Sequence, residues 1–274
     1  MRVGFIGLGS MGLPMAQRLH AQGHDLTVYA RRPASLEPFT GKDVTVAATP
    51  ADMGAVVEAV GICVFDAAGV YEVMFGSQGL AETLKPGSVV LVHSTVSADE
   101  VRKIALDAAA RGIRILDAPV SGGGPRAEVG ELTIMIGGDV GALADVSELV
   151  SSLSNNVIHL GEVGTGSFAK LINNTMFSAQ IALADDAMRA GESLGIDSAG
   201  LAAALLTSSS ACIASSIRLR AGSMAGILGT TVDLTLAKDV KLMTDVLGDS
   251  PGRELVDTAQ RFVAALAAAR AANR

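Results

Sequence analysis

The feature that most constrains this chain is a glycine-rich turn near its beginning, set between two short apolar segments. Residues 3–6 form an apolar run of strand length, and Gly7-Leu8-Gly9-Ser10-Met11-Gly12 follows directly. Apolar residues then recur at helical spacing up to Gly23, and residues 26–29 form a second apolar run. A strand, a glycine turn, a helix and a second strand in this order are typical of a dinucleotide-binding unit.

Each glycine of this turn has its own physical role. The first permits the tight turn, the second lets a pyrophosphate approach the backbone, and the third lets the helix pack closely on the strand. The helix N-terminus then offers amides and a partial positive charge to the phosphates. The predicted cofactor-binding residues of the turn are Gly7, Leu8, Gly9, Ser10, Met11 and Gly12.

The end of the second apolar run bears on the choice of cofactor. NAD-selective proteins usually carry an Asp or Glu there for the ribose hydroxyls, whereas this chain has Ala30-Arg31-Arg32. A guanidinium suits a 2′-phosphate, so we expect NADP, with NAD as the second option, and expect Arg31 and Arg32 to bind it. The alternative is that both arginines are plain surface charges.

Alternation of strands and helices continues along the first half of the chain. Predicted strands cover 44–47, 62–65, 89–92, 113–116 and 132–136, and predicted helices cover 50–57, 70–74 and 97–110. This spacing predicts a mostly parallel sheet covered on both faces, with ligands beyond the carboxyl ends of its strands. Asp66, Thr95 and Ser121 are expected at that edge, and we interpret His93, also at a strand end, as structural.

From residue 168 onward the pattern is helical only. Predicted helices cover 167–194, 198–206, 213–219, 236–247 and 253–270. The expected fold is therefore an α/β Rossmann-like doubly wound sheet followed by an all-α C-terminal domain, linked by a long helix. We expect an NADP-binding domain over 1–162 and a substrate and dimerisation domain over 163–274.

Two segments carry candidate chemistry. In the linking segment VGTGSFAKLINN, Lys170 and Asn174 stand four residues apart, which places both on one helix face. In the segment DAPVSGGG, the hydroxyl of Ser121 and the exposed amides of Gly122 and Gly123 can together bind a carboxylate. Alone, the first pair could be solvated polar surface and the second a flexible loop.

Composition excludes several classes of protein. A net charge of −7 with no long basic run argues against a nucleic-acid surface, and no stretch approaches the roughly 20 unbroken apolar residues of a membrane span. The two cysteines, Cys63 and Cys212, lack metal-ligand spacing and indicate reduced thiols. With no signal peptide recognisable at the start, we expect a cytoplasmic protein that binds neither nucleic acid nor metal.

Four segments in this order resemble the β-hydroxyacid dehydrogenase family, which includes 3-hydroxyisobutyrate dehydrogenase, tartronate semialdehyde reductase and, more distantly, 6-phosphogluconate dehydrogenase. They are GFIGLGSMGLPMAQRL, DAPVSGG with the following GELT, GTGSFAKLINN, and AKDV at residues 237–240. Together they span most of the chain and are far more specific than one glycine motif.

The resemblance implies a role for each matching position. Lys170 matches the catalytic lysine, Asn174 an asparagine that holds the substrate oxygen, and Ser121, Gly122 and Gly123 the segment that grips the substrate carboxylate. Thr95 and Lys238 match cofactor contacts, Arg31 matches an arginine of NADP-using members, and Phe65 lies in the segment beside the nicotinamide. The resemblance also implies an active site in a cleft between the domains, and dimers or tetramers formed through the helical domain.

Two departures keep a related class open. The segment CVFDAAGV lacks the family's usual Met-Leu-Pro, and His93 stands where an Asp is common; both features are similar to imine reductases. Those enzymes generally lack the lysine and the SGG triplet, which this chain keeps. We therefore predict an NADP-dependent oxidoreductase acting on a small β-hydroxy acid or its semialdehyde, with an imine reductase-like enzyme or a non-catalytic NADP-binding protein as alternatives.

Overall fold

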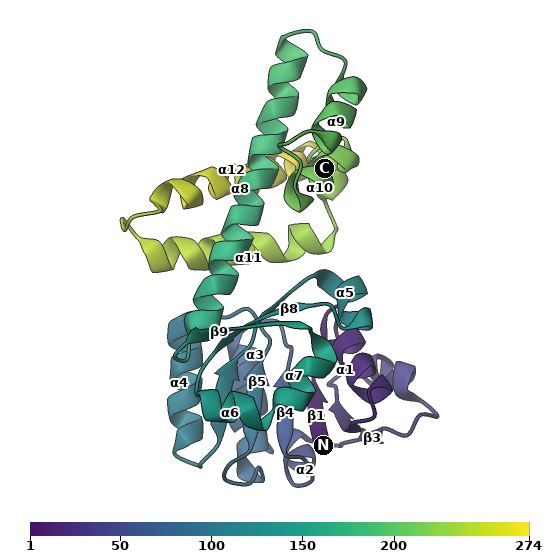
Figure 1. The fold of residues 1–274 in the computed structure, drawn as a ribbon, viewed down its shortest axis with the longest axis vertical. Helices are drawn as coiled ribbons and strands as arrows, with labels where there is room; N and C mark the ends of the chain where they lie inside the picture. The colour runs from purple at the N-terminus through teal and green to yellow at the C-terminus, as the bar shows by residue number, and fades with distance from the viewer. Residues whose placement is uncertain (274) are drawn as a thin grey trace. The chain divides into compact units, whose positions relative to one another are not determined.

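The chain forms two compact units, the first comprising Met1–Lys170 and the second beginning at Leu171. A computed structural model describes residues 1–273, without the side chains of residues 231 and 234. Figure 1 shows the first unit as a sheet flanked by helices and the second as helices only. The predicted fold class, a Rossmann-like sheet followed by an all-α region, is confirmed.

The elements of the first unit alternate between strands and helices. Its strands are β1 (Arg2–Ile6), β2 (Asp25–Tyr29), β3 (Thr45–Val46), β4 (Ala59–Ile62), β5 (Val89–Val92), β6 (Arg114–Asp117), β7 (Val120–Ser121), β8 (Thr133–Gly137) and β9 (Asn156–Gly161). Its helices are α1 (Gly12–Ala21), η1 (Pro33–Phe39), α2 (Pro50–Gly54), α3 (Ala67–Phe75), η2 (Leu80–Glu82), α4 (Ala98–Ala109), α5 (Gly123–Val129), α6 (Val140–Asp145) and α7 (Ser147–Leu153).

The sheet has the strand order of a doubly wound nucleotide-binding fold. Strands run β3-β2-β1-β4-β5-β6-β8-β7, with β9 paired to β8. The pairs from β3 to β6 are parallel, whereas β8 runs antiparallel to β6 and β7. The order reverses between β1 and β4, which is where sheets of this kind bind ligands.

Side chains alternate between two cores, one on each face of the sheet. Val3 and Phe5 of β1 pack with Met15 and Leu19 of α1 on one face, whereas Ile6 packs into the core of the other face. Strand β5 repeats this pattern, since Val89 and Leu91 join the first core and Val90 and Val92 the second. A strand buried on both faces reads as a continuous apolar run, which is why these segments could be recognised.

One predicted strand is wrong in position, because the segment expected at 62–65 pairs as Ala59–Ile62. Gly61 lies inside this strand opposite Phe5, where a Cβ atom would come within 2.7 Å of the aromatic ring. Glycine weakens a strand pattern in sequence, yet here it makes room for Phe5. Phe65 consequently lies beyond the strand, and its exposed fraction is 68%.

Other elements had no counterpart among the predictions. The glycine segment after Ser121 begins helix α5 instead of remaining a loop, and helices α6 and α7 and strand β9 were not predicted. Strand β9 is exposed along most of its length, so it lacks the alternation that marks a half-buried strand.

The second unit continues helix α8 (Thr165–Ser193) and adds α9 (Ser198–Thr207), α10 (Ile213–Ala221), η3 (Ala225–Ile227), α11 (Thr231–Leu247) and α12 (Arg253–Ala272). Its largest core joins Ile181 of α8, Leu236 of α11 and Phe262 of α12. Small side chains such as Ala182, Ala214 and Ala259 are buried between the helices and allow close packing. None of the helices described is both long enough and apolar enough to traverse a lipid bilayer.

Candidate functional site

The glycine turn of the first unit has the geometry of a phosphate-binding turn. Gly7 has φ +95°, and a Cβ atom there would lie 2.2 Å from the carbonyl oxygen of Cys63. A Cβ atom at Gly12 would lie 1.9 Å from the carbonyl oxygen of Gly7. At Gly9, by contrast, a Cβ atom would meet nothing within 4 Å. Two glycines are thus required by the fold, and the third leaves room for a ligand.

The N-terminus of α1 is available to an anion. Met11 is the N-cap and makes no side-chain hydrogen bond to the first turn, which also contains no acidic residue. The first amides of a helix lack partners within it and carry the positive end of the dipole. The turn Gly7–Gly12, including Leu8 and Ser10, therefore fits the pyrophosphate of a dinucleotide.

Arg31 and Arg32 follow β2, where a carboxylate for the ribose hydroxyls is usual. Both side chains are exposed, and within residues 1–273 neither forms an ion pair. Two guanidinium groups at this strand end are suited to a phosphate on the ribose.

Phe65 and Thr95 come from neighbouring loops at the carboxyl ends of β4 and β5. The backbone N–H of Val64 donates to Oγ of Ser94 over 2.9 Å and ties the two loops together. Val64 is followed by the exposed Phe65, and Ser94 by the half-buried Thr95; both following residues are predicted cofactor contacts. The structure thus holds these two residues on linked loops.

His93 has a structural role. It is 3% exposed, Nδ1 donates to the carbonyl oxygen of Ala118 over 2.7 Å, and the ring stacks on Phe5 with centroids 6.0 Å apart. Its buried Nε2 has no hydrogen-bond partner among the residues described. Burial lowers the pKa of His93 to about 4, so the imidazole is neutral at physiological pH.

The segment Ser121-Gly122-Gly123 lies between β7 and α5. Ser121 is paired with Thr133 of β8, and both glycines have positive φ, +136° and +77°. A Cβ atom on the next residue, Gly124, would lie 3.2 Å from the carbonyl oxygen of Ser10. The predicted carboxylate-binding segment therefore lies against the predicted phosphate-binding turn.

The helix that carries Lys170 begins at the carboxyl end of β6. Oδ1 of the fully buried Asp117 accepts the N–H of Gly164 over 2.8 Å, and Oδ2 accepts the N–H of Ser167 over 2.7 Å. Lys170 is half-buried one turn further along α8 and belongs to the same compact unit as the glycine turn. This compact unit ends at Lys170, whereas the domain boundary was expected between residues 162 and 163.

Asn174 and Lys238 meet through an aspartate in the helical unit. Nδ2 of the buried Asn174 donates to Oδ2 of Asp239 over 2.6 Å, and its Oδ1 accepts from Nδ2 of Asn173 over 3.0 Å. Nζ of Lys238 lies 3.9 Å from Oδ1 of Asp239. An amide nitrogen has two N–H groups and its oxygen two lone pairs, so Asn174 retains capacity for a substrate oxygen.

Asp117 and Asp239 were not predicted as site residues. Both stand in segments that carried the family resemblance, DAPVSGG and AKDV, but nothing in sequence shows that a carboxylate will be buried. Their burial, 0% and 1% exposed, is the signal that only the fold reveals.

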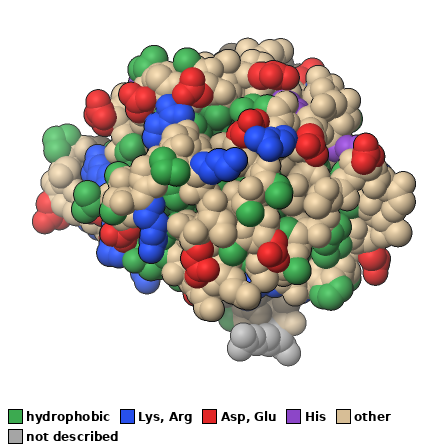
Figure 2. Space-filling model, turned by 90° about the horizontal axis from the view of Figure 1, so that it is seen from below, with side chains coloured by type: hydrophobic (Ala, Val, Ile, Leu, Met, Phe, Trp, Pro, Cys, Tyr) green, Lys and Arg blue, Asp and Glu red, His purple; other side chains and the backbone are tan. Residues whose placement is uncertain are grey.

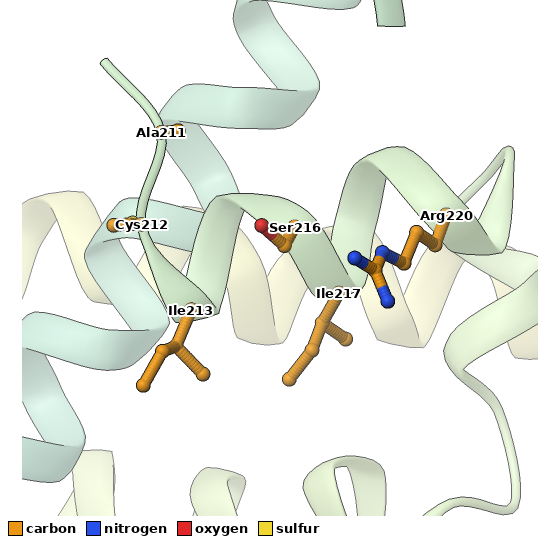
Figure 3. A pocket seen from close by; sticks show the side chains of 6 residues that line it. All are labelled: Ala211, Cys212, Ile213, Ser216, Ile217 and Arg220. Atoms are coloured by element: carbon orange, nitrogen blue, oxygen red, sulfur yellow. The ribbon is translucent and has the colours of Figure 1, made fainter. Parts of the chain in front are cut away.

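Two pockets are found away from these residues. One, about 460 Å³, is lined in the helical unit by Ala211, Cys212, Ile213, Ser216, Ile217 and Arg220. Figure 3 shows Ile213 and Ile217 projecting to the same side of α10. The other, about 280 Å³, is lined by His20, Gly23, His24, Asp25 and Asp43. Neither pocket is lined by a predicted site residue, and the described part of the chain contains no group of three or more His, Cys, Asp or Glu side chains that could hold a metal ion.

The fold and the glycine turn place the chain in the class of nicotinamide-nucleotide-binding proteins. The family model described as the NAD binding domain of 6-phosphogluconate dehydrogenase matches residues 2–161. Human mitochondrial 3-hydroxyisobutyrate dehydrogenase is 33% identical over 253 residues, which cover 89% of this chain and 74% of that protein. The chain belongs to the β-hydroxyacid dehydrogenase family, whose members are nicotinamide-dependent dehydrogenases.

Two further comparisons agree. An uncharacterized oxidoreductase of Mycobacterium tuberculosis is 39% identical over 196 residues, 72% of this chain and 66% of that protein. The matched region thus spans just under two thirds of that relative. The crystal structure of 3-hydroxyisobutyrate dehydrogenase from Salmonella typhimurium is similar with a TM-score of 0.82 and 26% identity, covering 98% of this chain and 95% of that one.

Proposed function

We propose that this protein is an NADP-dependent oxidoreductase that transfers hydride between the nicotinamide and the β-carbon of a small hydroxy acid or its semialdehyde. The observation that carries the proposal is an arrangement within the first unit: the glycine turn Gly7–Gly12, the segment Ser121-Gly122-Gly123 against it, and Lys170 on a helix whose start is capped by Asp117. Family membership supports the reaction class.

The cofactor would be held by residues already described. The turn Gly7–Gly12 and the N-terminus of α1 would bind the pyrophosphate, and Arg31 with Arg32 the 2′-phosphate. Phe65, Thr95 and Lys238 complete the proposed contacts. When bound, the cofactor supplies or accepts the hydride, and NAD remains a weaker alternative to NADP.

Lys170 is the proposed proton carrier. During reduction its ammonium group donates a proton to the forming alkoxide, and during oxidation its neutral amine accepts the hydroxyl proton. Asn174 follows four residues later on the same helix, where its amide would orient the substrate oxygen. Ser121 and the amides of Gly122 and Gly123 would bind the carboxylate, which defines the substrate as a small acid.

The decisive test measures NADPH oxidation by wild type and Lys170→Ala with glyoxylate and with succinic, tartronate and methylmalonate semialdehydes. General acid–base catalysis contributes ~10²–10⁴-fold, so Lys170→Ala should lose at least about 100-fold in turnover while binding NADPH normally. Repeating the assay with NADH measures the preference attributed to Arg31. Near-normal turnover of Lys170→Ala would refute the proposed role.

Imine reduction is the second candidate, because His93 and the segment around Phe65 are the two features that resemble imine reductases. Adding cyclic imines to the same assay separates the two reactions. Reduction of the imines without reduction of glyoxylate or the semialdehydes would favour imine reduction. A non-catalytic NADP-binding protein would instead bind NADPH and turn over neither class.

We also propose that the protein assembles as a homodimer or homotetramer through its helical unit and acts in the cytoplasm. Ile172, Met176 and Leu183 of α8 are 47%, 52% and 53% exposed, and helical spacing places all three on one face. Exposed apolar side chains that share one helix face are typical of interfaces. Cys63 and Cys212 are free thiols, which suits a reducing compartment.

A further inference from the structure

Asp117 is fully buried between the carboxyl end of β6 and the start of α8. Burial of a carboxylate is costly unless hydrogen bonds compensate for lost hydration. Both oxygens of Asp117 receive backbone N–H groups, those of Gly164 and Ser167, at 2.8 and 2.7 Å. These partners lie about one helical turn apart on the segment that starts α8.

The carboxylate acts as a helix cap supplied from another element. Caps usually come from the residue just before the helix, whereas Asp117 is 50 residues away from Ser167 in sequence. A negative charge at a helix N-terminus is stabilised by the dipole, and charge-assisted hydrogen bonds are about twice as strong as neutral ones. The cap therefore ties the first turn of α8 to the carboxyl end of β6.

The surrounding packing leaves this start little freedom. A Cβ atom at Gly166 would lie 2.5 Å from the carbonyl oxygen of Met135 and 2.8 Å from that of Asp117. The same addition at Gly137 would come within 2.5 Å of Oδ1 of Asp117. The helix backbone is thus seated directly on strands β6 and β8.

A second contact holds the segment from the side of α4. Nε of Arg102 donates to the carbonyl oxygen of Val163 over 3.1 Å, and its guanidinium lies 5.2 Å from the ring centroid of Phe168. Arg102 is half-exposed, so it can be replaced with less risk to folding than Asp117.

Lys170 lies three residues beyond Ser167, a rise of about 4.5 Å along the helix axis. Any tilt or unwinding of the first turn therefore moves its amine, and misplacement of a reacting group by about 1 Å can cost 10²-fold in rate. We propose that Asp117 is a positioning residue for catalysis: its carboxylate sets the position of Lys170 by capping α8. This inference rests on the proposed function, in which Lys170 carries the proton.

The test is a double-mutant cycle on the full-length protein. Asp117→Asn keeps the size of the side chain and one acceptor but removes the charge and the second acceptor. We expect kcat for the best substrate of the panel to fall about tenfold or more, with the Kd of NADPH changed less than about twofold. In a Lys170→Ala background, assayed by single turnover at high enzyme concentration, the same substitution should cause no further loss.

Asp139→Asn is the matched control, because Asp139 also caps a helix of this unit, accepting the N–H of Ala142 over 2.7 Å, but that helix carries no predicted site residue. It should lower the melting temperature without changing kcat. Equal losses from Asp117→Asn in both backgrounds, or unchanged kcat in the wild-type background, would overturn the inference while leaving the proposed function intact.

If Asp117→Asn does not fold, Arg102→Gln takes its place in the same cycle and decides in the same way, since it loosens the same turn from outside. Near-normal turnover of Lys170→Ala would mark failure of the proposed function itself. The two failures are therefore distinguished by separate variants.

Discussion

At the scale of single residues, the chain separates polar groups that serve stability from those placed for chemistry. His93 and Asp117 stand at neighbouring strand ends, and both are almost completely buried. The imidazole connects β5 to the chain after β6 through Ala118, whereas the carboxylate connects β6 to the helix of Lys170. A titratable side chain at a ligand-binding edge is thus no proof of catalysis, and its hydrogen-bond partners decide its role.

The neutral state of His93 predicts a specific pH dependence of stability. Burial lowers the folded pKa to about 4 from an ordinary value of 6.5, so the unfolded chain binds more protons between these values. The contribution is present above about pH 6.5 and is lost as the pH falls to about 4. A shift of this size corresponds to about 3 kcal/mol.

Urea unfolding at pH 7.5 and pH 5 measures this effect in wild type and His93→Leu. The variant loses the bond to Ala118 and is less stable at both pH values, but its stability should change less between them. Burial also lowers the pKa of His24, but His24 is present in both proteins. The difference between wild type and variant in the change of unfolding free energy from pH 7.5 to pH 5 therefore isolates His93. An equal change of unfolding free energy in the two proteins would show that His93 does not titrate as described.

At the scale of elements, the strand–turn–helix unit was the most predictable part of the chain because its signals are local. The boundaries of β1, β2 and β5 follow from apolar runs, and the glycine spacing follows from backbone sterics. Strand β4 was misplaced because Gly61 is required by the packing of Phe5 on the neighbouring strand. Helix α5 was missed because Gly123 and Gly124 are poor helix formers, and their position depends on contact with the turn at Ser10.

The candidate site shows the same division between local and long-range information. Lys170 and Asn174 could be paired from helical spacing, and the glycine turn from its flanking strands. The capping of α8 by Asp117, however, joins residues 47 and 50 positions apart, and the bond from Asn174 to Asp239 spans 65. Such contacts depend on the packing of whole elements, which no local pattern encodes.

The glycine turn offers a prediction within one element. Gly12→Ala would force a Cβ atom to within 1.9 Å of a backbone oxygen, so it should destabilise the fold by about 1–3 kcal/mol. Gly9→Ala meets open space and should fold with near-normal stability, but its methyl group would occupy the path of the pyrophosphate.

Thermal unfolding and NADPH titration of the two variants separate these effects. Gly9→Ala should weaken NADPH binding at least about tenfold at nearly unchanged melting temperature, because phosphate contacts are charge-assisted hydrogen bonds worth about 1.5–3 kcal/mol. Gly12→Ala, by contrast, should lower the melting temperature. Unimpaired NADPH binding by Gly9→Ala would place the cofactor elsewhere.

At the scale of the whole molecule, surface composition distinguishes two kinds of region. On the face shown in Figure 2, Lys and Arg side chains lie among Asp and Glu side chains rather than in one continuous basic area. This distribution agrees with the net charge of −7 and suits a small anionic ligand bound at a local basic site more than a polyanion. Ile172, Met176 and Leu183 form an exposed apolar stripe along one face of α8.

That stripe predicts how copies of the chain associate. Leu183 lies within it, 53% exposed, and a lysine there would place a charge in an interface that excludes water, which is strongly unfavourable. Light scattering coupled to gel filtration should show a dimer or tetramer for wild type and a shift toward monomer for Leu183→Lys.

Leu106→Lys is the matched control, because Leu106 is 74% exposed on α4 of the other unit, so its charge should leave the assembly unchanged. A monomeric wild type, or an intact Leu183→Lys assembly, would contradict association through this face. Since α8 also carries Lys170 and Asn174, loss of the assembly with retained turnover would further show that one chain contains the complete catalytic machinery.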